Sequence, residues 1–597
     1  MAIGGGLELR NRGDQGSEWA GASSANGATR PGAWARAAAL AIHLLAAVVL
    51  TWPLAARLGT HLPQGTEVAG TIPLFNLWSL RWNADRLAHG YAGYWDAPIF
   101  RPERDTLALS EPQPATGIAF ATLRAVSRSD VAGFGLVVLA TFLANGLAAT
   151  WLLRGLGVRF VPAHGAGLAA QALPFVVHEL GVLQLLAVYP IFGALRGLTD
   201  VARAPSLRHG VVLGVFVALT GLTCSYYAVG LPLFLALGAA FLGERRHLTL
   251  ERRATAAALA VALAVAALML APTLIGQLRG TAAYERSDRA RQDLSASPAD
   301  WLRPHPDGIV APRLPWTTDP SVRHTRHLYP GTVLLLLAGG ALVALARGPR
   351  ARWIGYAAVG ASLAFVLSLG PRLELGEWRP YDLLASWVPG FAKIRSPFRF
   401  AVFGQLFLVI LAGLALDGLW RARGRARGFA VLLVAAALVE GVAVPAALTQ
   451  YPGNAMREPW VAWLAEQPAG IAVHLPRPPA LGARTATPVV VSMLQSLEHG
   501  KPLGDGYSGF VPASYRALRE LLGTFPSDPS LDALRERGIV YVIVARDWFA
   551  RLPSQGRIAI RRRLDTVYAG DDKLILRLRP ANGSSRARPP GPGPASS

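Results

Sequence analysis

The chain has 597 residues, of which 52% are hydrophobic and only 16% charged, a composition too apolar for an ordinary soluble protein. Its formal net charge is +22, but the basic residues lie in short clusters between apolar runs. This pattern argues against a nucleic-acid partner. The single cysteine, Cys224, excludes a disulfide framework and a cysteine-based metal site.

Residues 1–34 are polar and rich in glycine and serine, which predicts a disordered cytoplasmic tail and no cleavable signal peptide. A transmembrane domain is predicted over 35–449, because apolar runs of about 20 residues can cross the hydrocarbon layer. The eleven predicted spans are 37–57, 131–153, 161–177, 181–199, 209–226, 227–243, 254–278, 328–346, 353–369, 399–420 and 428–448.

The loops that would face the cytoplasm, if the N-terminus lies there, are all short and basic. Their arginines are Arg154, Arg159, Arg196, Arg203, Arg208, Arg245, Arg246, Arg252, Arg253, Arg347, Arg350, Arg352, Arg421, Arg423, Arg425 and Arg427. The pattern predicts a multi-pass protein of a bacterial inner (cytoplasmic) membrane with a cytoplasmic N-terminus. A lipid or solute transporter is a rival interpretation, but we find no clear internal repeat and no paired charges in the middle of a span.

The first long loop, 58–116, begins with a predicted amphipathic helix. Its sequence, "IPLFNLWSLRWNADRLAHG", places Leu74, Leu77, Trp78 and Trp82 on one helical face. Tryptophans on such a face are suited to the membrane interface.

The rest of this loop carries carboxylates that are candidates for proton transfer. The candidates are Glu67, Asp96 and Glu111. The alternative is that these acids form a solvated loop surface. Asp96 and Glu111 are favoured as catalytic residues, because each is embedded in apolar or aromatic sequence.

A second candidate site precedes the span at 399–420, where "FAKIRSPFRF" collects Lys393, Arg395 and Arg399. These cations either anchor the helix at the membrane interface or bind a phosphate. Pro397 fixes the chain at the helix start, and a helix N-terminus favours an anion. Both interpretations stay open from the sequence.

Two further features stand out along the chain. His178 and Glu179 lie at a turn after the third span, where they are either binding residues or solvated. "GDGYSGF" (504–510) lacks the features of a phosphate-binding P-loop, and we interpret it as a tight loop facing the mouth of the membrane site.

Residues 450–580 differ from the preceding part of the chain, because none of their apolar runs is long enough to span a membrane. "WVAWLAEQP", "ASYRALRELLGTF" and "SLDALRERG" predict helices, whereas "GIAVHLP", "IVYVIVA" and "KLILRLRP" predict strands. This alternation predicts an α/β domain, and the odd number of spans places it outside the cytoplasm. The end of the chain, 581–597, is a second predicted disordered tail.

Four stretches together carry a family resemblance: "LFNLWSLRWNADRL", "WDAPIFRPERDTLALSEP", "PGFAKIRSPFRF" and "GDGYSGFVPASY". With the layout of the spans, they resemble the GT-C superfamily of polytopic membrane glycosyltransferases, closest to an uncharacterised bacterial group. The resemblance implies a polyprenyl-phosphate sugar donor, a cell-envelope glycan or protein acceptor, and acidic catalytic residues in the first loop. A divalent metal, Mg or Mn, is a possible cofactor.

The chain departs from this resemblance at one position. Relatives commonly carry an aspartate before the interfacial helix, where this chain has Thr71. A hydroxyl cannot act as a carboxylate base. The chain therefore either relies on Glu67, Asp96 and Glu111, or it is a catalytically degenerate scaffold.

Overall fold

The computed structural model describes residues 31–305, 307–309, 327–345, 348 and 350–579. The tail predicted at 581–597 lies outside the described residues, as does most of the tail predicted at 1–34. The chain divides into two compact units, Met1–Ile42 and His43–Ser597. The first long helix, α2, runs from one unit into the other.

Within the described residues, eight helical segments are long and apolar enough to cross a membrane, so the chain has the composition of a multi-pass membrane protein. They are Ala33–Leu50, Asp130–Gly155, Phe160–His178, Leu183–Arg203, Ser225–Leu242, Arg252–Thr281, Ala351–Arg372 and Pro397–Ala422. Two of the remaining predicted spans coincide with shorter apolar helices, Leu207–Thr223 and Thr332–Ala344, and the last coincides with α19.

The helices that make up this part of the chain are α2 (Ala33–Leu50), α5 (Asp130–Gly155), α6 (Phe160–Gln171), α7 (Pro174–His178), α8 (Leu183–Leu186), α9 (Tyr189–Arg203), α10 (Leu207–Thr223), α11 (Ser225–Leu242), α12 (Arg245–Leu248), α13 (Arg252–Thr281), α14 (Asp288–Asp293), α15 (Thr332–Leu345), α16 (Ala351–Leu369), α17 (Pro380–Trp387), α18 (Ala401–Ala422) and α19 (Arg425–Gly441). Proline divides the third predicted span, because Pro174 has no N–H to continue α6 and instead begins α7.

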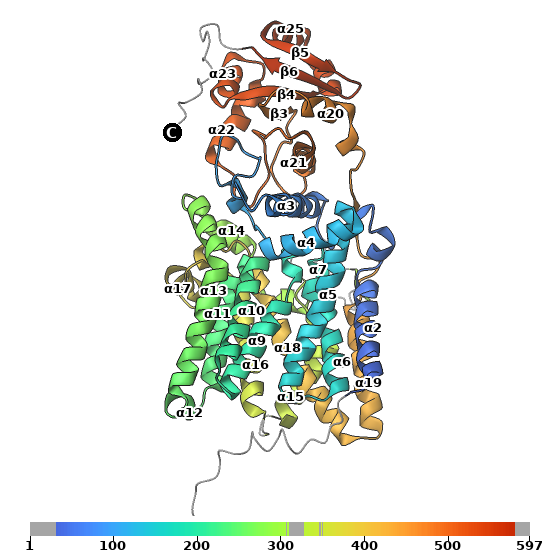
Figure 1. Cartoon of the computed structure of the whole chain (residues 1–597), viewed down its shortest axis with the longest axis vertical. Coiled ribbons are helices and arrows are strands. Elements are labelled where there is room, and N and C mark those ends of the chain that lie inside the picture. The colour runs from blue at the N-terminus through green and yellow to red at the C-terminus, as the bar shows by residue number, and fades with distance from the viewer. Residues whose placement is uncertain (1–30, 306, 310–326, 346–347, 349, 580–597) are drawn as a thin grey trace, which may run out of the picture. The chain divides into compact units, whose positions relative to one another are not determined.

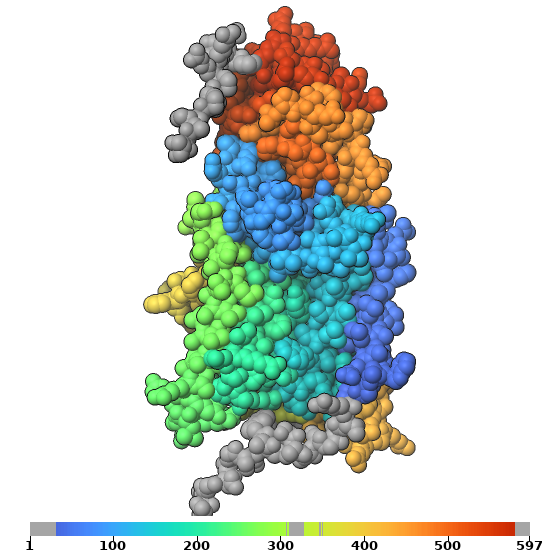
Figure 2. Space-filling view, viewed as in Figure 1, coloured from blue at the N-terminus to red at the C-terminus, as the bar shows by residue number. Residues whose placement is uncertain are grey.

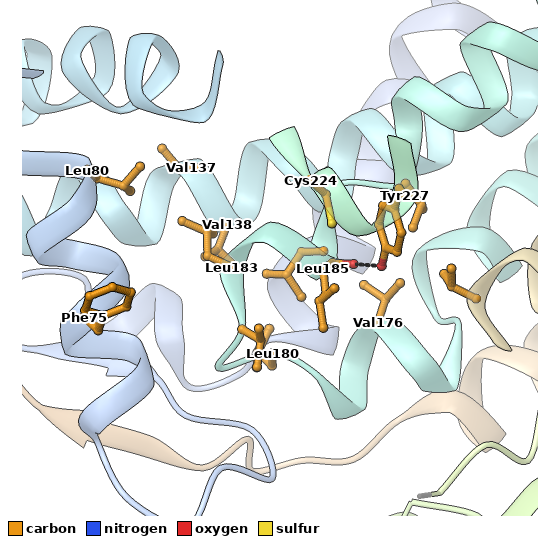
Figure 3. Close-up of a cluster of buried hydrophobic side chains, with 14 of the residues drawn as sticks. Phe75, Leu80, Val137, Val138, Val176, Leu180, Leu183, Leu185, Cys224 and Tyr227 are labelled. Atoms are coloured by element: carbon orange, nitrogen blue, oxygen red, sulfur yellow. Dashed lines mark hydrogen bonds between the residues drawn. The ribbon is translucent and has the colours of Figure 1, made fainter. Parts of the chain in front are cut away.

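α18 is the central helix, since α6, α15 and α16 all pack against it and most of its residues are buried. Beside it, Tyr227 of α11 donates a hydrogen bond of 2.7 Å to the Leu185 carbonyl within a cluster of buried apolar side chains (Figure 3). By contrast, α13 exposes Leu263 and Leu268, as expected for a helix that faces lipid.

Charge is buried near the end of α18. Asp417 is fully buried and forms ion pairs with Arg159, Arg350 and Arg421, with N–O distances of 2.9–3.0 Å. We call these four residues the Asp417 network. These ion pairs lie near the C-terminal end of α18 and not in its middle.

The first loop contains α3 (Thr71–Ala88) and α4 (Pro114–Ser127), and both lie across one end of the helices of the second unit (Figure 1). The expectation that Trp78 and Trp82 lie at the membrane interface is wrong. Their exposed fractions are 1% and 8%, and Trp82 donates a hydrogen bond to the Tyr94 carbonyl. The apolar face of α3 is therefore covered by protein.

A short antiparallel pair, β1 (His61–Pro63) and β2 (Leu448–Gln450), connects the start of the first loop to the segment after α19. The later elements are α20 (Pro459–Ala465), β3 (Ile471–Leu475), α21 (Thr487–His499), α22 (Ala513–Leu521), α23 (Asp528–Glu536), β4 (Ile539–Ala545), α24 (Arg546–Arg551), α25 (Ser554–Arg563), β5 (Leu564–Ala569) and β6 (Lys573–Leu578). All three helices and three strands predicted here from the sequence are present, whereas α21, α24, α25 and β5 were not predicted.

These strands form one four-stranded sheet with the order β3-β4-β6-β5. β3 and β4 are parallel, and the other two pairings are antiparallel. α21 packs on α3, so this region contacts the first loop directly. In the space-filling view the surfaces of the two regions meet without a gap on the face shown (Figure 2).

Candidate functional site

Glu67 and Glu179 come together because the loop before α3 packs against the turn after α7. The backbone N–H and the hydroxyl of Thr66 both donate to the His178 carbonyl, at 3.3 and 3.1 Å. Gly65 has a φ of +56°, and a Cβ there would lie 2.9 Å from the same oxygen. Only glycine fits such a close approach with positive φ.

The two carboxyl groups have perturbed proton affinities. Burial raises the pKa of Glu179 to about 7, with Arg399 opposing the shift and the charge of Glu67 adding to it. Burial also raises the pKa of Glu67, against the opposing charges of Arg399 and Arg395. Glu67 is half-buried whereas Glu179 is only 5% exposed, so Glu67 is the more accessible of the two.

Glu111 joins the first loop to the start of α11. One of its carboxylate oxygens accepts a hydrogen bond of 3.0 Å from the backbone N–H of Ser225, the first residue of that helix. Such N–H groups have no partner within their own helix and favour an anion. Burial raises the pKa of Glu111, opposed by the hydrogen bonds from Ser225 and by the charge of Arg399.

Two predicted arginines in the segment before α18 act electrostatically on these carboxylates, Arg399 on all three and Arg395 on Glu67. Arg399 lies in the short helix η9 (Pro397–Phe400), and its guanidinium lies 4.5 Å from the centre of the Tyr226 ring. Its Nε is buried and has no hydrogen-bond partner in the part of the chain that the structure describes. Arg395 is exposed. Arg399 therefore lies deeper in the site than Arg395.

A third arginine, Arg286, was not predicted from the sequence. Its Nη1 donates a hydrogen bond of 2.8 Å to the Gly509 carbonyl, and its guanidinium lies 3.5 Å from the centre of the Phe510 ring. Burial lowers the pKa of Arg286 to about 10, with Arg395 and Arg399 adding to the effect. Arg286 lies in the charged stretch "YERSDRARQD", so no local signal distinguishes it from its neighbours.

Six side chains thus share one electrostatic environment, and we call them the glutamate–arginine cluster. Its members are Glu67, Glu111, Glu179, Arg286, Arg395 and Arg399. Among the described residues, no nitrogen of its arginines lies within 4.0 Å of one of its carboxylate oxygens. The cations and carboxylates therefore influence one another without closing into ion pairs.

The profile of the family described as "Domain of unknown function (DUF6311)" matches residues 96–441, more than half of the chain. The chain belongs to this family. No curated protein sequence matches it.

Solved structures show the same fold. The chain is similar to the arabinofuranosyltransferase AftD from Mycobacteria, with a TM-score of 0.58 and 19% identity over 92% of this chain and 40% of AftD. The R1389S mutant of AftD gives a TM-score of 0.54 and 18% identity over 90% and 41% of the two chains. These similarities confirm the GT-C resemblance at the level of the fold.

An oligosaccharyltransferase from Archaeoglobus fulgidus also matches, with a TM-score of 0.46 and 12% identity over 87% of this chain and 70% of that one. The chain spans about two fifths of the length of AftD.

The DUF6311 match covers most of the glutamate–arginine cluster but not Glu67, which precedes it. It also includes Asp96, whose role as a catalytic residue stays a prediction. An Asp96 carboxylate oxygen accepts a hydrogen bond of 3.0 Å from the backbone N–H of Asp105, and its charge acts on Arg279. In this structure Asp96 thus has a local bonding role in the first loop.

Lys393 is engaged by backbone groups. Its ammonium donates to the carbonyls of Thr281, at 3.0 Å, and of Tyr284. These bonds tie the segment before α18 to the end of α13. A role of Lys393 in substrate binding stays a prediction, but its donors already have partners here.

His178 is buried, and its ring centre lies 5.3 Å from those of both His305 and His327. Neither ring nitrogen of His178 has a hydrogen-bond partner. Across the described part of the chain, however, no three His, Cys, Asp or Glu side chains are arranged to hold a metal ion.

Thr71, which replaces the expected aspartate, is fully buried. Its hydroxyl lies 2.6 Å from both the Ala483 carbonyl oxygen and the Thr487 hydroxyl oxygen. Both partners belong to the region that follows the membrane helices. Thr71 thus connects α3 to that region.

Proposed function

We propose that this DUF6311 protein is a membrane glycosyltransferase. It moves a sugar from a polyprenyl-phosphate donor to a cell-envelope acceptor, either a glycan or a protein. The observation that carries the proposal is the glutamate–arginine cluster, in which arginines and glutamates face each other without pairing. The GT-C fold supports this proposal, because AftD, which has a similar fold, is an arabinofuranosyltransferase.

The proposed topology has about eleven spans in a bacterial inner membrane, with the N-terminus in the cytoplasm. The basic loops, including those at Arg245 and Arg425, would face the cytoplasm. The cluster lies at the opposite end of α18 from the basic turn after Arg421. Transfer would thus occur on the outer face, beside an extracytoplasmic α/β domain at 450–580.

Arg395 and Arg399 bind the phosphate in this proposal. Charge-assisted hydrogen bonds from guanidinium groups to phosphate are strong, and they also stabilise the negative charge that grows on the leaving phosphate. Arg399 has a buried, unpartnered Nε, and the absence of a close carboxylate leaves its donors available for a ligand. The exposed Arg395 lies where a donor would enter.

Glu67 is the proposed general base. The carboxylates favoured from the sequence, Glu111 and Asp96, each accept a hydrogen bond from a backbone N–H. Glu67 is half-buried, has a raised pKa and lies within electrostatic reach of Arg395 and Arg399. A base must be able to take a proton, which favours Glu67, because among the described residues its carboxylate accepts no hydrogen bond.

The proposed reaction is a single displacement at the anomeric carbon of the donor sugar. The acceptor oxygen forms the new C–O bond while the bond to the phosphate oxygen breaks and the polyprenyl phosphate leaves with the electron pair. The acceptor proton passes to Glu67. Glu179 and Glu111 position the site, since Glu179 lies beside the base and Glu111 holds the start of α11. The sequence expectation of Mg or Mn stays a prediction, testable by EDTA treatment, and no step depends on it.

The test is transfer by the reconstituted protein from radiolabelled decaprenyl-phosphate sugars to envelope extracts. Glu67→Gln should lower the rate by about 10²- to 10⁴-fold, the usual contribution of a general base. Asp96→Asn is the matched control and should keep most of the activity. Equal rates for Glu67→Gln and the unmutated protein would show that Glu67 is not the base.

A catalytically degenerate scaffold is the second candidate, and the observation that favours it is Thr71 in place of the expected aspartate. It predicts that no lipid-linked sugar in the panel is transferred by the unmutated protein. A lipid or solute transporter predicts movement of the donor across vesicles without any transfer.

A further inference from the structure

The loop Gly504–Phe510, "GDGYSGF", is bonded to the first loop near both of its ends. The backbone N–H of Phe100 donates to the Asp505 carbonyl at 3.0 Å, and that of Phe510 donates to the Leu109 carbonyl at 2.9 Å. A Cβ at Gly506 would lie 2.8 Å from the Phe100 ring, so the close approach requires glycine.

This anchoring brings Tyr507 to the glutamate–arginine cluster. Its ring packs edge-on against Phe75 of α3, with 5.5 Å between the ring centres. The charges of Arg395 and Glu67 both act on its hydroxyl. Burial raises the pKa of Tyr507 to about 12, so the hydroxyl keeps its proton and can both donate and accept a hydrogen bond.

Phe510, at the other end of the loop, forms a second aromatic contact on the same side of the cluster. Its ring centre lies 5.3 Å from that of Tyr284, and Arg286 lies over its face. Tyr507, Phe510 and Tyr284 are all half-buried. The cluster is therefore bordered, on the side of the C-terminal region, by aromatic rings that remain partly accessible.

We propose that Tyr507 binds the acceptor and that the acceptor is a saccharide; this inference rests on the proposed transfer reaction. A sugar has apolar C–H faces and a rim of hydroxyl groups, which suit an aromatic surface with a few polar groups placed beside it. Tyr507 supplies both a ring and a hydroxyl. The charge of Glu67, the proposed base, acts on this same hydroxyl.

A peptide acceptor fits this loop less well. Extended peptides are commonly bound by adding a strand to free backbone groups at a sheet edge. In the loop, the N–H of Phe510 and the carbonyls of Asp505 and Gly509 already have partners in the first loop and in Arg286. Recognition here therefore depends on side chains, which favours a saccharide over a polypeptide.

The experiment measures binding by saturation-transfer-difference NMR, with the full chain in lipid nanodiscs. The probes are methyl α-arabinofuranoside, methyl α-mannopyranoside, methyl α-glucopyranoside, the capped tripeptide Asn-Gly-Thr and farnesyl phosphate. Tyr507→Phe should weaken binding of the preferred glycoside about two- to tenfold through loss of one hydrogen bond. Tyr507→Ala should weaken it more than about tenfold, since the ring is lost as well. Farnesyl phosphate should bind both variants as it binds the unmutated protein.

Tyr568→Phe is the matched control, because Tyr568 packs on Trp463 within the C-terminal region and should change neither affinity. The inference is overturned if Tyr507→Phe and Tyr507→Ala bind the glycosides as the unmutated protein does. It is also overturned if no glycoside binds, if only the tripeptide binds, or if farnesyl phosphate binding falls as much as glycoside binding. Tyr507→Phe preserves the packing, so the test holds even if Tyr507→Ala does not fold. Failure of the unmutated protein to bind farnesyl phosphate counts instead against the proposed function.

Discussion

The two ends of α18 both gather buried or half-buried charge, but they do so in opposite ways. At one end, Asp417 accepts three arginines at 2.9–3.0 Å and has no exposed surface. At the other end, Arg399 lies among three glutamates and has none of them within 4.0 Å in the described structure. The Asp417 network is thus fully ion-paired, whereas the glutamate–arginine cluster has no ion pair among its described members.

This difference separates charged residues that stabilise the fold from charged residues that are suited to bind a ligand. A buried charge is tolerated when its partners satisfy it, as the Asp417 network does for its carboxylate. Charges held near one another but unpaired are costly unless a ligand completes them. The comparison therefore predicts that damage to the Asp417 network lowers stability, whereas damage to the glutamate–arginine cluster lowers ligand binding.

The largest effect on stability should come from Asp417→Asn. The three guanidinium groups lose their counter-charge, and breaking such buried pairs costs about 3–5 kcal/mol. We expect a large fall in the thermal midpoint of the purified protein. Asp200→Asn is the control, because Asp200 forms a helical pair with Arg196 worth only about 0.3–0.5 kcal/mol. Equal midpoints for Asp417→Asn and the unmutated protein would contradict a structural role.

Glu179→Gln should stabilise the protein in a pH-dependent way. The pKa of Glu179 is about 7 in the folded protein against an ordinary value of 4.5, so the folded state holds the proton more tightly between these values. The free energy of unfolding therefore falls as pH rises through this window, by up to about 3 kcal/mol. Glutamine mimics the protonated form.

The thermal midpoint of Glu179→Gln should accordingly exceed that of the unmutated protein at pH 8 and match it at pH 4.5. The exposed Glu285 supplies the control, since Glu285→Gln should shift the midpoint equally at both pH values. A difference that grows as the pH falls would contradict the assignment.

Thr71→Asp should lower stability by about 1–3 kcal/mol, because a carboxylate would be buried against the Ala483 carbonyl. Thr71→Ser keeps the hydroxyl and serves as the control. We expect neither variant to gain transfer activity. A gain of transfer in Thr71→Asp, starting from an inactive protein, would instead support the degenerate scaffold.

The smallest effect should come from Lys393→Ala. The lysine bonds two backbone carbonyls, so its loss should cost about 1 kcal/mol and leave farnesyl phosphate binding unchanged. A tenfold loss of farnesyl phosphate binding would instead support the prediction from the sequence that Lys393 binds the phosphate.

The sequence predicted many of the helices and strands, because their formation depends mainly on residues that are close together in the chain. Apolar length predicted where helices would lie, and alternation predicted strands β3, β4 and β6. The lone Asp417 in the apolar run "LALDGLW" was an available signal for a buried ion pair, because charge within a span needs a partner.

Contacts across long sequence separations could not be predicted in the same way. Trp78 and Trp82 have the pattern of an interfacial helix, but both are buried in the protein, and Trp82 donates a hydrogen bond to Tyr94 of the same loop. Arg286 and Tyr507 reach the glutamate–arginine cluster only through pairings with residues more than 200 positions away, such as that of Arg286 with Gly509. No periodicity or charge pattern encodes such pairings.

Above all, we propose that the glutamate–arginine cluster binds a lipid phosphate. The most direct measurement is the affinity of the purified protein for farnesyl phosphate, by calorimetry, before and after Arg395→Ala together with Arg399→Ala. Each lost charge-assisted contact is worth about 1.5–3 kcal/mol, so the double variant should bind at least about 100-fold more weakly. Arg279→Ala is the control, because Arg279 is paired with Asp105, and it should bind normally. Equal affinities of the double variant and the unmutated protein would contradict the claim and leave both arginines as helix anchors.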